Sequence, residues 1–442
     1  MKKDKLNTIL RSYVKENLSP KSEDISFISE IYQSIKNVLG DANCIQVGSY
    51  SRFTSVIPLH DLDILYIIGD WDKVDIDPLE QLNTLNDKLI KLYASPRGLK
   101  FETKVQSHSI SIKYFDKHTE VFAVDIVPSL IFEKNEFGKN MFYVPEIIKL
   151  KRGKLRENYY LDLKNQNHKI HWIPTDPLGY IEEAKRINEK NSDFRKSVKF
   201  LKSWKDRCKI DNVDFKIKSF HIEQLLVNAF KNDSSLEIFD AVFYFLTDLK
   251  LHLIKPAIVD RANRSRFIDE YISELSPSQL DIISKAVDSI LIQLENVEPG
   301  KNIEQTLNSG INGRTVGSES FLFDQRIPVL SDSSLEFEID AKIIKHEGSL
   351  LWGNMLSKVG YVVEIGNKLR FTIIKNNTGG DLIKWKVKND KICNHERGEI
   401  TDNKTKNDPE SVAYKGKHFV EAYSIKDNVC IAKHSIKVIV PK

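Results

Sequence analysis

Cysteine is scarce and scattered in this chain of 442 residues. The four cysteines are isolated from one another, and no C-x-x-C pair occurs: Cys44, Cys208, Cys393 and Cys430. This spacing argues against a disulfide framework and against a cysteine-rich zinc site. It favours a reducing compartment, and we therefore expect a cytoplasmic protein.

Long apolar runs and a strong charge of one sign are missing too. No uninterrupted apolar stretch approaches the roughly 18 residues that span a bilayer. The charged start MKKDKLNTIL has no apolar core of a signal peptide, so we expect neither secretion nor membrane insertion. The chain has 66 Lys and Arg against 62 Asp and Glu, a net charge of +4. This balance argues against a protein that coats duplex nucleic acid, but it leaves room for a local basic cleft.

The length predicts about three domains, and the pattern of apolar residues changes along the chain. Helical spacing in residues 1–40 gives way to short apolar runs typical of mixed α/β structure. The helical pattern returns after the Thr-Asp-Pro at 175–177, and the last segment alternates at period two, as antiparallel strands do. We predict an α+β fold with a core at 1–175, a helical lobe at 176–296, a linker at 297–325 and an antiparallel β-sandwich at 326–442.

Several element boundaries are specific enough to test. Gly40 should end the second helix, and a helix should begin at the lobe junction, led by Thr175 or Asp176 with Pro177 in its first turn. Further helices are expected near 219–231, 235–252 and 277–294. Apolar alternation predicts strands in the sandwich through Phe337, Ile339, Ala341 and Ile343, through Leu369, Phe371 and Ile373, through Ile383, Trp385 and Val387, through Phe419, Glu421 and Tyr423, and through Ile436, Val438 and Val440.

The stretch VGSYSRFTSVIPLHDLDILYII at 47–68 contains two acids that enter a strand, Asp61 and Asp63. Residues i and i+2 of a strand share a face, so their carboxylates project together. Paired carboxylates repel one another unless a cation lies between them. Hard oxygen donors of this kind suit Mg²⁺ or Mn²⁺ bound with substrate phosphates. A lone D-x-D is common, however, and has a plain structural interpretation as well.

A third acid, Asp125, lies within the apolar run VFAVDIVPSL. A charged group there needs a partner. If its strand pairs beside the strand of Asp61, the three acids can hold two metal ions that activate a hydroxyl and neutralise a leaving pyrophosphate. The alternative is a structural buried acid. Gly48 and Ser49 precede these acids, and a glycine turn lets backbone N–H groups and a hydroxyl approach phosphates closely.

This ordered set resembles the polymerase-beta-type nucleotidyltransferase superfamily. Within it, the chain is similar to the bacterial relatives of cyclic GMP-AMP synthase and oligoadenylate synthase, which make cyclic oligonucleotides in anti-phage signalling. The resemblance implies that Asp61, Asp63 and Asp125 hold two Mg²⁺ (or Mn²⁺) ions and that Gly48 and Ser49 grip phosphate. Phe53 departs from the family pattern, because many members have glycine before the threonine.

The helical lobe carries a basic stripe of Arg195, Lys199 and Lys202 at i, i+4 and i+7, which could also be a solvated helix face. Ser219 stands just before a predicted helix, where we expect it to act as the N-cap and to favour anions. By resemblance, Lys202 and Ser219 bind the donor triphosphate, with Lys199 beside them.

The last hundred residues resemble a β-rich module that is often attached to these synthases and proposed to sense a nucleotide or another ligand. The matching stretches are WKVKN at 385–389, Arg397-Gly398-Glu399, and residues 410–433. The whole resemblance implies an enzyme that joins NTPs into cyclic products and releases pyrophosphate, with an unknown activating ligand at the sandwich and no requirement for nucleic acid. Two alternatives stay open: a nucleotidyltransferase acting on an RNA or protein acceptor, and an inactive nucleotide sensor.

Overall fold

The computed structural model describes most of the chain and divides it into two compact units. The described residues are 2–71, 77–146, 171–297, 303, 319–332, 334–344, 353–390, 393, 395 and 397–441. One unit runs from Asn7 to Ile283, and the other joins Met1–Leu6 to Ser284–Lys442. Each unit is described by itself. The expected boundary at residue 175 falls inside the first unit and stays a prediction, and most of the expected linker lies outside the described residues.

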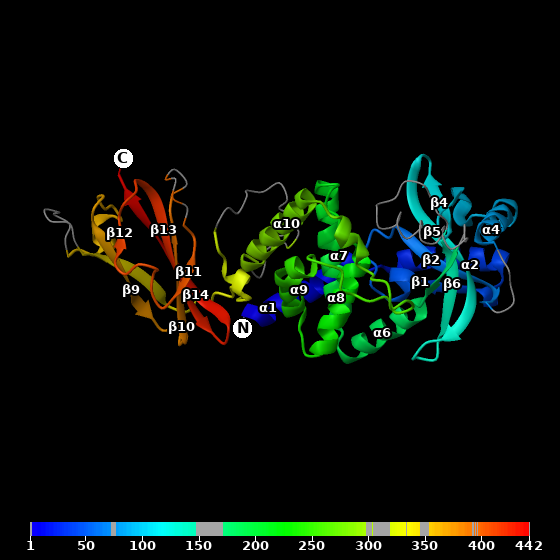
Figure 1. Cartoon of the computed structure of the whole chain (residues 1–442), viewed down its shortest axis with the longest axis horizontal. Coiled ribbons are helices and arrows are strands. Elements are labelled where there is room, and N and C mark those ends of the chain that lie inside the picture. Colours follow the sequence, from blue (N-terminus) through cyan, green and yellow to red (C-terminus); the bar gives the residue numbers. More distant parts are fainter. Residues whose placement is uncertain are drawn as a thin grey trace. The chain divides into compact units, whose positions relative to one another are not determined.

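A mixed sheet organises the first unit (Figure 1). Its strands are β1 (Cys44–Val47), β2 (Asp61–Asp70), β3 (Lys100–Val105), β4 (Ile110–Asp116), β5 (Thr119–Lys134), β6 (Asn140–Glu146) and β7 (His171–Thr175). The order is β1-β2-β5-β4-β3, with β6 pairing with β5 and with β7. Strands β2 and β5 are parallel, and the other pairings in this sheet are antiparallel. The mixed α/β segment predicted from the sequence is confirmed.

The helices of this unit follow the predicted positions closely. Those that lie wholly in it are a π-helical segment η1 (Val14–Leu18), α2 (Ser22–Leu39), the one-turn α3 (Gly48–Ser51), α4 (Pro78–Leu92), α6 (Pro177–Lys190), α7 (Asp193–Asp211), α8 (Ser219–Asn232) and α9 (Ile238–His252). Two more helices, α1 (Lys2–Tyr13) and α10 (Pro277–Glu295), are divided between the two units. Gly40 ends α2 with a φ of 96°, as expected. The Asp176 carboxylate accepts a hydrogen bond from the Gly179 N–H at the start of α6, so the predicted helix start is confirmed.

The two faces of the sheet are covered by different helices. Leu62 and Ile64 of β2 pack with α2 and α4 in one apolar core (Figure 1). Leu65, which points the other way, packs in a second core against which Leu178 and Ile181 of α6 lie. Because side chains alternate along a strand, Asp61 and Asp63 share the face of Leu65. The carboxylates therefore project on the face opposite to α2 and α4.

The second unit contains two antiparallel sheets that share one apolar core. Its strands are β8 (Phe337–Ile343), β9 (Lys368–Asn376), β10 (Leu382–Lys388), β11 (Ile400–Asp402), β12 (Glu410–Ser411), β13 (Gly416–Lys426) and β14 (Val429–Val440). One sheet has the order β11-β10-β13-β14 and the other the order β12-β9-β8. Residues of both sheets meet in the core, so the predicted sandwich is confirmed (Figure 1).

One strand of the sandwich turns its predicted apolar residues to the other side. In β13 the residues Val420 and Ala422 are in the core, whereas Phe419 is 40% exposed. The period-two pattern identified the strand, but it did not say which of its two faces is buried. Within the described part of the chain, no helix is both long and apolar enough to cross a bilayer. All four cysteines are free.

Candidate active site

The parallel pairing of β2 and β5 brings the predicted acids together. Asp63 lies directly opposite Asp125 in the register, and Asp61 lies opposite Ala123 two residues earlier. Residues in register on adjacent strands share a face, so Asp125 joins the face that carries Asp61 and Asp63. Asp61 is exposed, and the other two are half-buried. The strand pairing that the sequence left conditional is therefore present.

The turn after β1 lies directly against Asp63. Val47 pairs with Asp63 in the register, and the next residue, Gly48, has a φ of 73°. A Cβ atom on Gly48 would lie 1.8 Å from Oδ2 of Asp63, which no side chain can tolerate. Glycine is thus required twice here, once for the left-handed backbone and once for the close approach.

Hydrogen bonds to Ser49 close this turn. The carbonyl oxygen of Ser49 accepts from the Thr54 N–H at 3.0 Å and from its hydroxyl at 3.3 Å. Phe53, just before Thr54, has a φ of 59°. A left-handed backbone explains why glycine is common at this place in the family that the sequence resembles, and phenylalanine bears a steric cost of about 1–2 kcal/mol there.

The carboxylates are electrostatically strained as they stand. Burial raises the pKa of Asp63 to about 6, and repulsion from Asp61 and Asp125 adds to this. Burial also raises the pKa of Asp125, with further repulsion from Asp61, while a hydrogen bond from Ser111 opposes the shift. Gln106 Nε2 lies 3.5 Å from Oδ1 of Asp125 as a further donor. A cation placed among these oxygens would relieve the repulsion.

The donor set fits a hard divalent cation, although the side chains are not closed into a cage. In the described part of the chain, no three His, Cys, Asp or Glu side chains are gathered closely enough to hold a metal ion by themselves. Mg²⁺ is commonly held by one or two carboxylates together with substrate phosphates and water. Mutually repelling carboxylates on one face of two paired strands match that need, since the substrate would supply the remaining ligands.

Lys202 lies in a buried ion cluster behind the Gly48 turn. Its ammonium group donates to Thr54 O and Oγ1 and to Glu223 Oε2, at 3.1 Å in each case. Arg52 Nε pairs with the other oxygen of Glu223. Burial alone would raise the pKa of Glu223, but the charges of Arg52 and Lys202 lower it to about 2. Lys202 is thus already neutralised and connects the turn to the helical part of the unit.

A different lysine contacts Ser219. Lys205 Nζ donates to the Ser219 hydroxyl at 2.7 Å. The expectation that Ser219 caps α8 was wrong, because Lys218 occupies the N-cap and Ser219 is the first helical residue. Sequence reasoning missed Lys205, which lies only three residues after Lys202. The basic stripe indicated a cationic helix face, but it did not identify the member that reaches α8.

Lys199 lies away from these groups. Its ammonium donates to the Ser19 hydroxyl at 2.9 Å, and it lines a cavity formed by α1, η1 and α7. Burial, with smaller contributions from Arg195 and Lys202, lowers the pKa of Lys199 to about 8. The predicted set therefore divides into the acids with Gly48 and Ser49, the buried Lys202 cluster, the Lys205–Ser219 pair, and a separate cavity with Lys199.

Comparison with known protein families gives a match in the C-terminal part of the chain. Residues 318–441 match the adenylyl/guanylyl and SMODS C-terminal sensor domain family. This match confirms the resemblance seen in the sequence of the sandwich, and it covers less than half of the chain. No significant match was found among curated proteins.

Solved structures similar to this chain include two of CdnC from E. coli MS115-1. One, in complex with HORMA-ΔN, has 17% identity and a TM-score of 0.48, covering 70% of this chain and 97% of its own. The other, with ATP, has 18% identity and a TM-score of 0.47, covering 68% and 94%. The cyclic dinucleotide synthase CdnE from Elizabethkingia meningoseptica, with GTP and Apcpp, has 14% identity, a TM-score of 0.40 and coverage of 56% and 84%.

Proposed function

We propose that this chain is a metal-dependent nucleotidyltransferase that joins NTPs into cyclic di- or oligonucleotides. The observation that carries the proposal is the in-register pairing of Asp63 with Asp125, with Gly48 against the Asp63 carboxylate. Such a site places acidic oxygens beside a turn whose backbone N–H groups can donate hydrogen bonds to a phosphate. The sensor domain at 318–441 is of the adenylyl/guanylyl and SMODS type, which supports a signalling product.

Asp61, Asp63 and Asp125 are the residues that would hold Mg²⁺ or Mn²⁺. When bound, two such ions neutralise charge on the reacting phosphate and on the leaving pyrophosphate. Asp125 is the candidate to orient the attacking ribose hydroxyl and to accept its proton, because it lies opposite Asp63 on the shared face. The Gly48 turn positions the donor phosphates through backbone N–H groups and the Ser49 hydroxyl.

Lys205 and Ser219 are the side chains that we assign to the triphosphate of the donor nucleotide, whose β- and γ-phosphates leave as pyrophosphate. They already contact each other at 2.7 Å, so a phosphate oxygen could replace or join this hydrogen bond. Lys202 supports the site indirectly, because its ammonium and Arg52 are both paired with Glu223 and it also holds Thr54 of the phosphate turn. Transfer at phosphorus depends mainly on positive groups held in fixed positions around the phosphates, because the protein itself forms few covalent bonds in such a reaction.

The test is loss of pyrophosphate release in the double variant Asp61→Asn/Asp63→Asn, with an unchanged melting temperature. Asp116→Asn, on an exposed residue at the end of β4, is the matched control and should keep full activity. Pyrophosphate release that persists in the double variant would contradict the proposal. Incubation with labelled NTPs and no acceptor separates the remaining alternatives, since a phosphatase-resistant small product indicates cyclisation, whereas a requirement for RNA or protein indicates transfer to an acceptor.

We assign the sandwich a regulatory role in anti-phage signalling. In this role it binds a phage- or host-derived ligand and controls the activity of the core. The match of residues 318–441 to a sensor domain family supports this assignment. Removal of residues from 326 onward should change either basal synthesis or its induction. Induction in infected cells that is identical with and without these residues would contradict the assignment. We place the reaction in the cytoplasm, which suits the four free cysteines.

A further inference from the structure

The unit from Asn7 to Ile283 contains a second basic cavity. It has a volume of about 340 Å³ and lies between α1, η1, Phe53 and the first half of α7. Five cations line it: Arg11, Lys15, Arg195, Lys196 and Lys199. Among the described residues that line it, none is acidic and none belongs to the predicted acids or to the Lys205–Ser219 pair, while Phe53 comes from the turn between Ser49 and Thr54. Small-molecule sites begin at about this volume.

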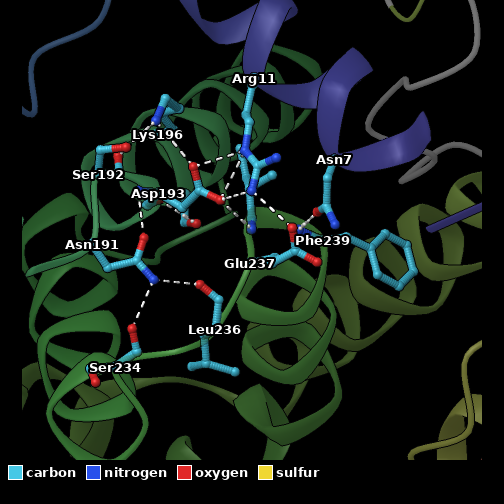
Figure 2. Close-up of polar contacts among 12 residues, drawn as sticks. Asn7, Arg11, Asn191, Ser192, Asp193, Lys196, Ser234, Leu236, Glu237 and Phe239 are labelled. Carbon is cyan, nitrogen blue, oxygen red and sulfur yellow. Dashed lines mark hydrogen bonds and ion pairs between the residues drawn. The ribbon is translucent and has the colours of Figure 1, made fainter. Parts of the chain in front are cut away.

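Two of the five cations are already neutralised. Asp193 accepts from Arg11 Nε at 3.0 Å and from Lys196 Nζ at 3.0 Å, and Glu237 accepts from the Arg11 guanidinium at 3.0 Å (Figure 2). The carboxylate of Asp193 also receives the Ile238 N–H at 3.1 Å. The carboxylates of Asp193 and Glu237 are thus paired with Arg11 and Lys196, so they contribute little negative charge to the rest of the cavity.

Arg195 and Lys199 are less compensated than Arg11 and Lys196: Arg195 is attracted only by the more distant carboxylates of Glu189 and Glu223, and no carboxylate contributes to the pKa shift of Lys199. Within the part of the chain that the structure describes, neither forms a salt bridge, and the buried Nε of Arg195 has no hydrogen-bond acceptor. The only hydrogen bond of the Lys199 ammonium in that part is to the Ser19 hydroxyl. The two side chains are one turn apart on α7, so they can face the same ligand. Their mutual repulsion contributes to the lowered pKa of Lys199.

Phe53 adds an aromatic surface to these charges. The Arg195 guanidinium lies 4.7 Å from the centre of the Phe53 ring, and Phe53 is 63% exposed. The ring therefore offers open surface on which a planar group can stack. Its neighbour Thr54 binds Ser49 and Lys202, so an occupant of this cavity would touch the same turn that carries Gly48.

We propose that this cavity is a second binding site for a small phosphorylated ligand, with Arg195 and Lys199 binding adjacent phosphate groups. Two cations without salt bridges, a buried guanidinium N–H without an acceptor and a lining without acidic side chains favour the binding of an anion. Two sources share this chemistry, a nucleoside diphosphate and an inorganic polyphosphate. Phe53 favours the nucleotide, because it can stack a base.

The test is calorimetric titration of the full chain with ADP, without divalent metal. The wild-type protein should bind ADP at this cavity in addition to any binding at the active site. Arg195→Gln/Lys199→Gln should lose one site, or weaken it at least tenfold, and keep the other. Lys205→Gln/Ser219→Ala should keep the cavity site, so failure of the proposed function and failure of this inference give different results. Unchanged stoichiometry and affinity in Arg195→Gln/Lys199→Gln would overturn the inference.

Control variants exclude a structural effect. Lys209→Gln changes an exposed residue of the same helix and should leave ADP binding unchanged. Arg195→Lys/Lys199→Arg keeps both positive charges and should retain the ADP binding that Arg195→Gln/Lys199→Gln loses. Tripolyphosphate distinguishes the sources: a nucleotide site binds ADP more tightly and loses that preference in Phe53→Leu, whereas a polyphosphate site binds both alike. If the charge-removing variant instead loses binding to duplex oligonucleotides while ADP binding stays unchanged, the cavity is not a small-ligand site.

Discussion

Replacement of Gly48 by alanine tests how the phosphate turn and the acids depend on each other. The added Cβ would lie 1.8 Å from Oδ2 of Asp63, and ordinary contact begins near 3.4 Å, so the carboxylate must move by about 1.6 Å. Misplacement of a catalytic group by about 1 Å can cost roughly a hundredfold in rate. We therefore expect Gly48→Ala to lower kcat at least a hundredfold in a pyrophosphate-release assay.

Gly138 provides a matched control for the backbone cost. Its φ of 71° is close to the 73° of Gly48, but nothing lies within 4 Å of a Cβ atom built on it. Gly138→Ala should lose about 1–2 kcal/mol of unfolding free energy, because alanine is forced into a left-handed conformation, and Gly48→Ala should lose at least as much, because the contact with Asp63 adds to the same backbone cost. Only Gly48→Ala should show the hundredfold fall in kcat. If the two variants keep equal kcat values, the close approach of Gly48 to Asp63 does not matter for catalysis.

Three further predictions concern the Glu223 ion cluster, the titration of His221 and the role of the C-terminal residues. Glu223→Gln should cost about 3–5 kcal/mol in urea unfolding, because it leaves Arg52 and Lys202 uncompensated. Glu182→Gln breaks an i,i+4 surface pair and should cost less than about 1 kcal/mol, and equal losses would contradict the argument. Burial lowers the pKa of His221 to about 4, below the roughly 6.5 of the unfolded chain, so stability should fall by up to about 1.4 kcal/mol per unit as pH drops from 6.5 to 4. His221→Gln should flatten this slope, and an unchanged slope would exclude His221 as its source. Deletion from residue 326 onward should change induction of synthesis while the Asn7–Ile283 unit keeps its own melting transition.

The sequence was most informative where periodicity and spacing act locally. The i, i+2 spacing placed Asp61 and Asp63 on one face of a strand, and helical and alternating patterns located α8, α10 and the sandwich strands. Gly40 and Asp176 marked helix ends because a left-handed stop and a capping carboxylate are properties of single residues. These predictions need no knowledge of how distant segments meet.

Contacts between distant segments were harder to predict. Three lysines lie within seven residues of α7, and only their orientation decides that Lys202 meets Glu223, Lys205 meets Ser219 and Lys199 meets Ser19. Glu223 gave no signal, because an acid in an apolar helix becomes informative only when its buried cations are known. The pairing of β2 with β5 was conditional for the same reason. In β13, both faces alternate equally well, so the pattern alone could not say that Phe419 lies on the more exposed face.

Mass spectrometry of the products formed from all four NTPs with Mg²⁺ tests the central claim most directly. The account predicts a phosphatase-resistant cyclic di- or oligonucleotide together with pyrophosphate, made without any acceptor. Both should be absent from Asp61→Asn/Asp63→Asn and present at full level in Asp116→Asn. Product that persists in the double variant, or NTP that is consumed only when RNA or protein is supplied, would contradict it.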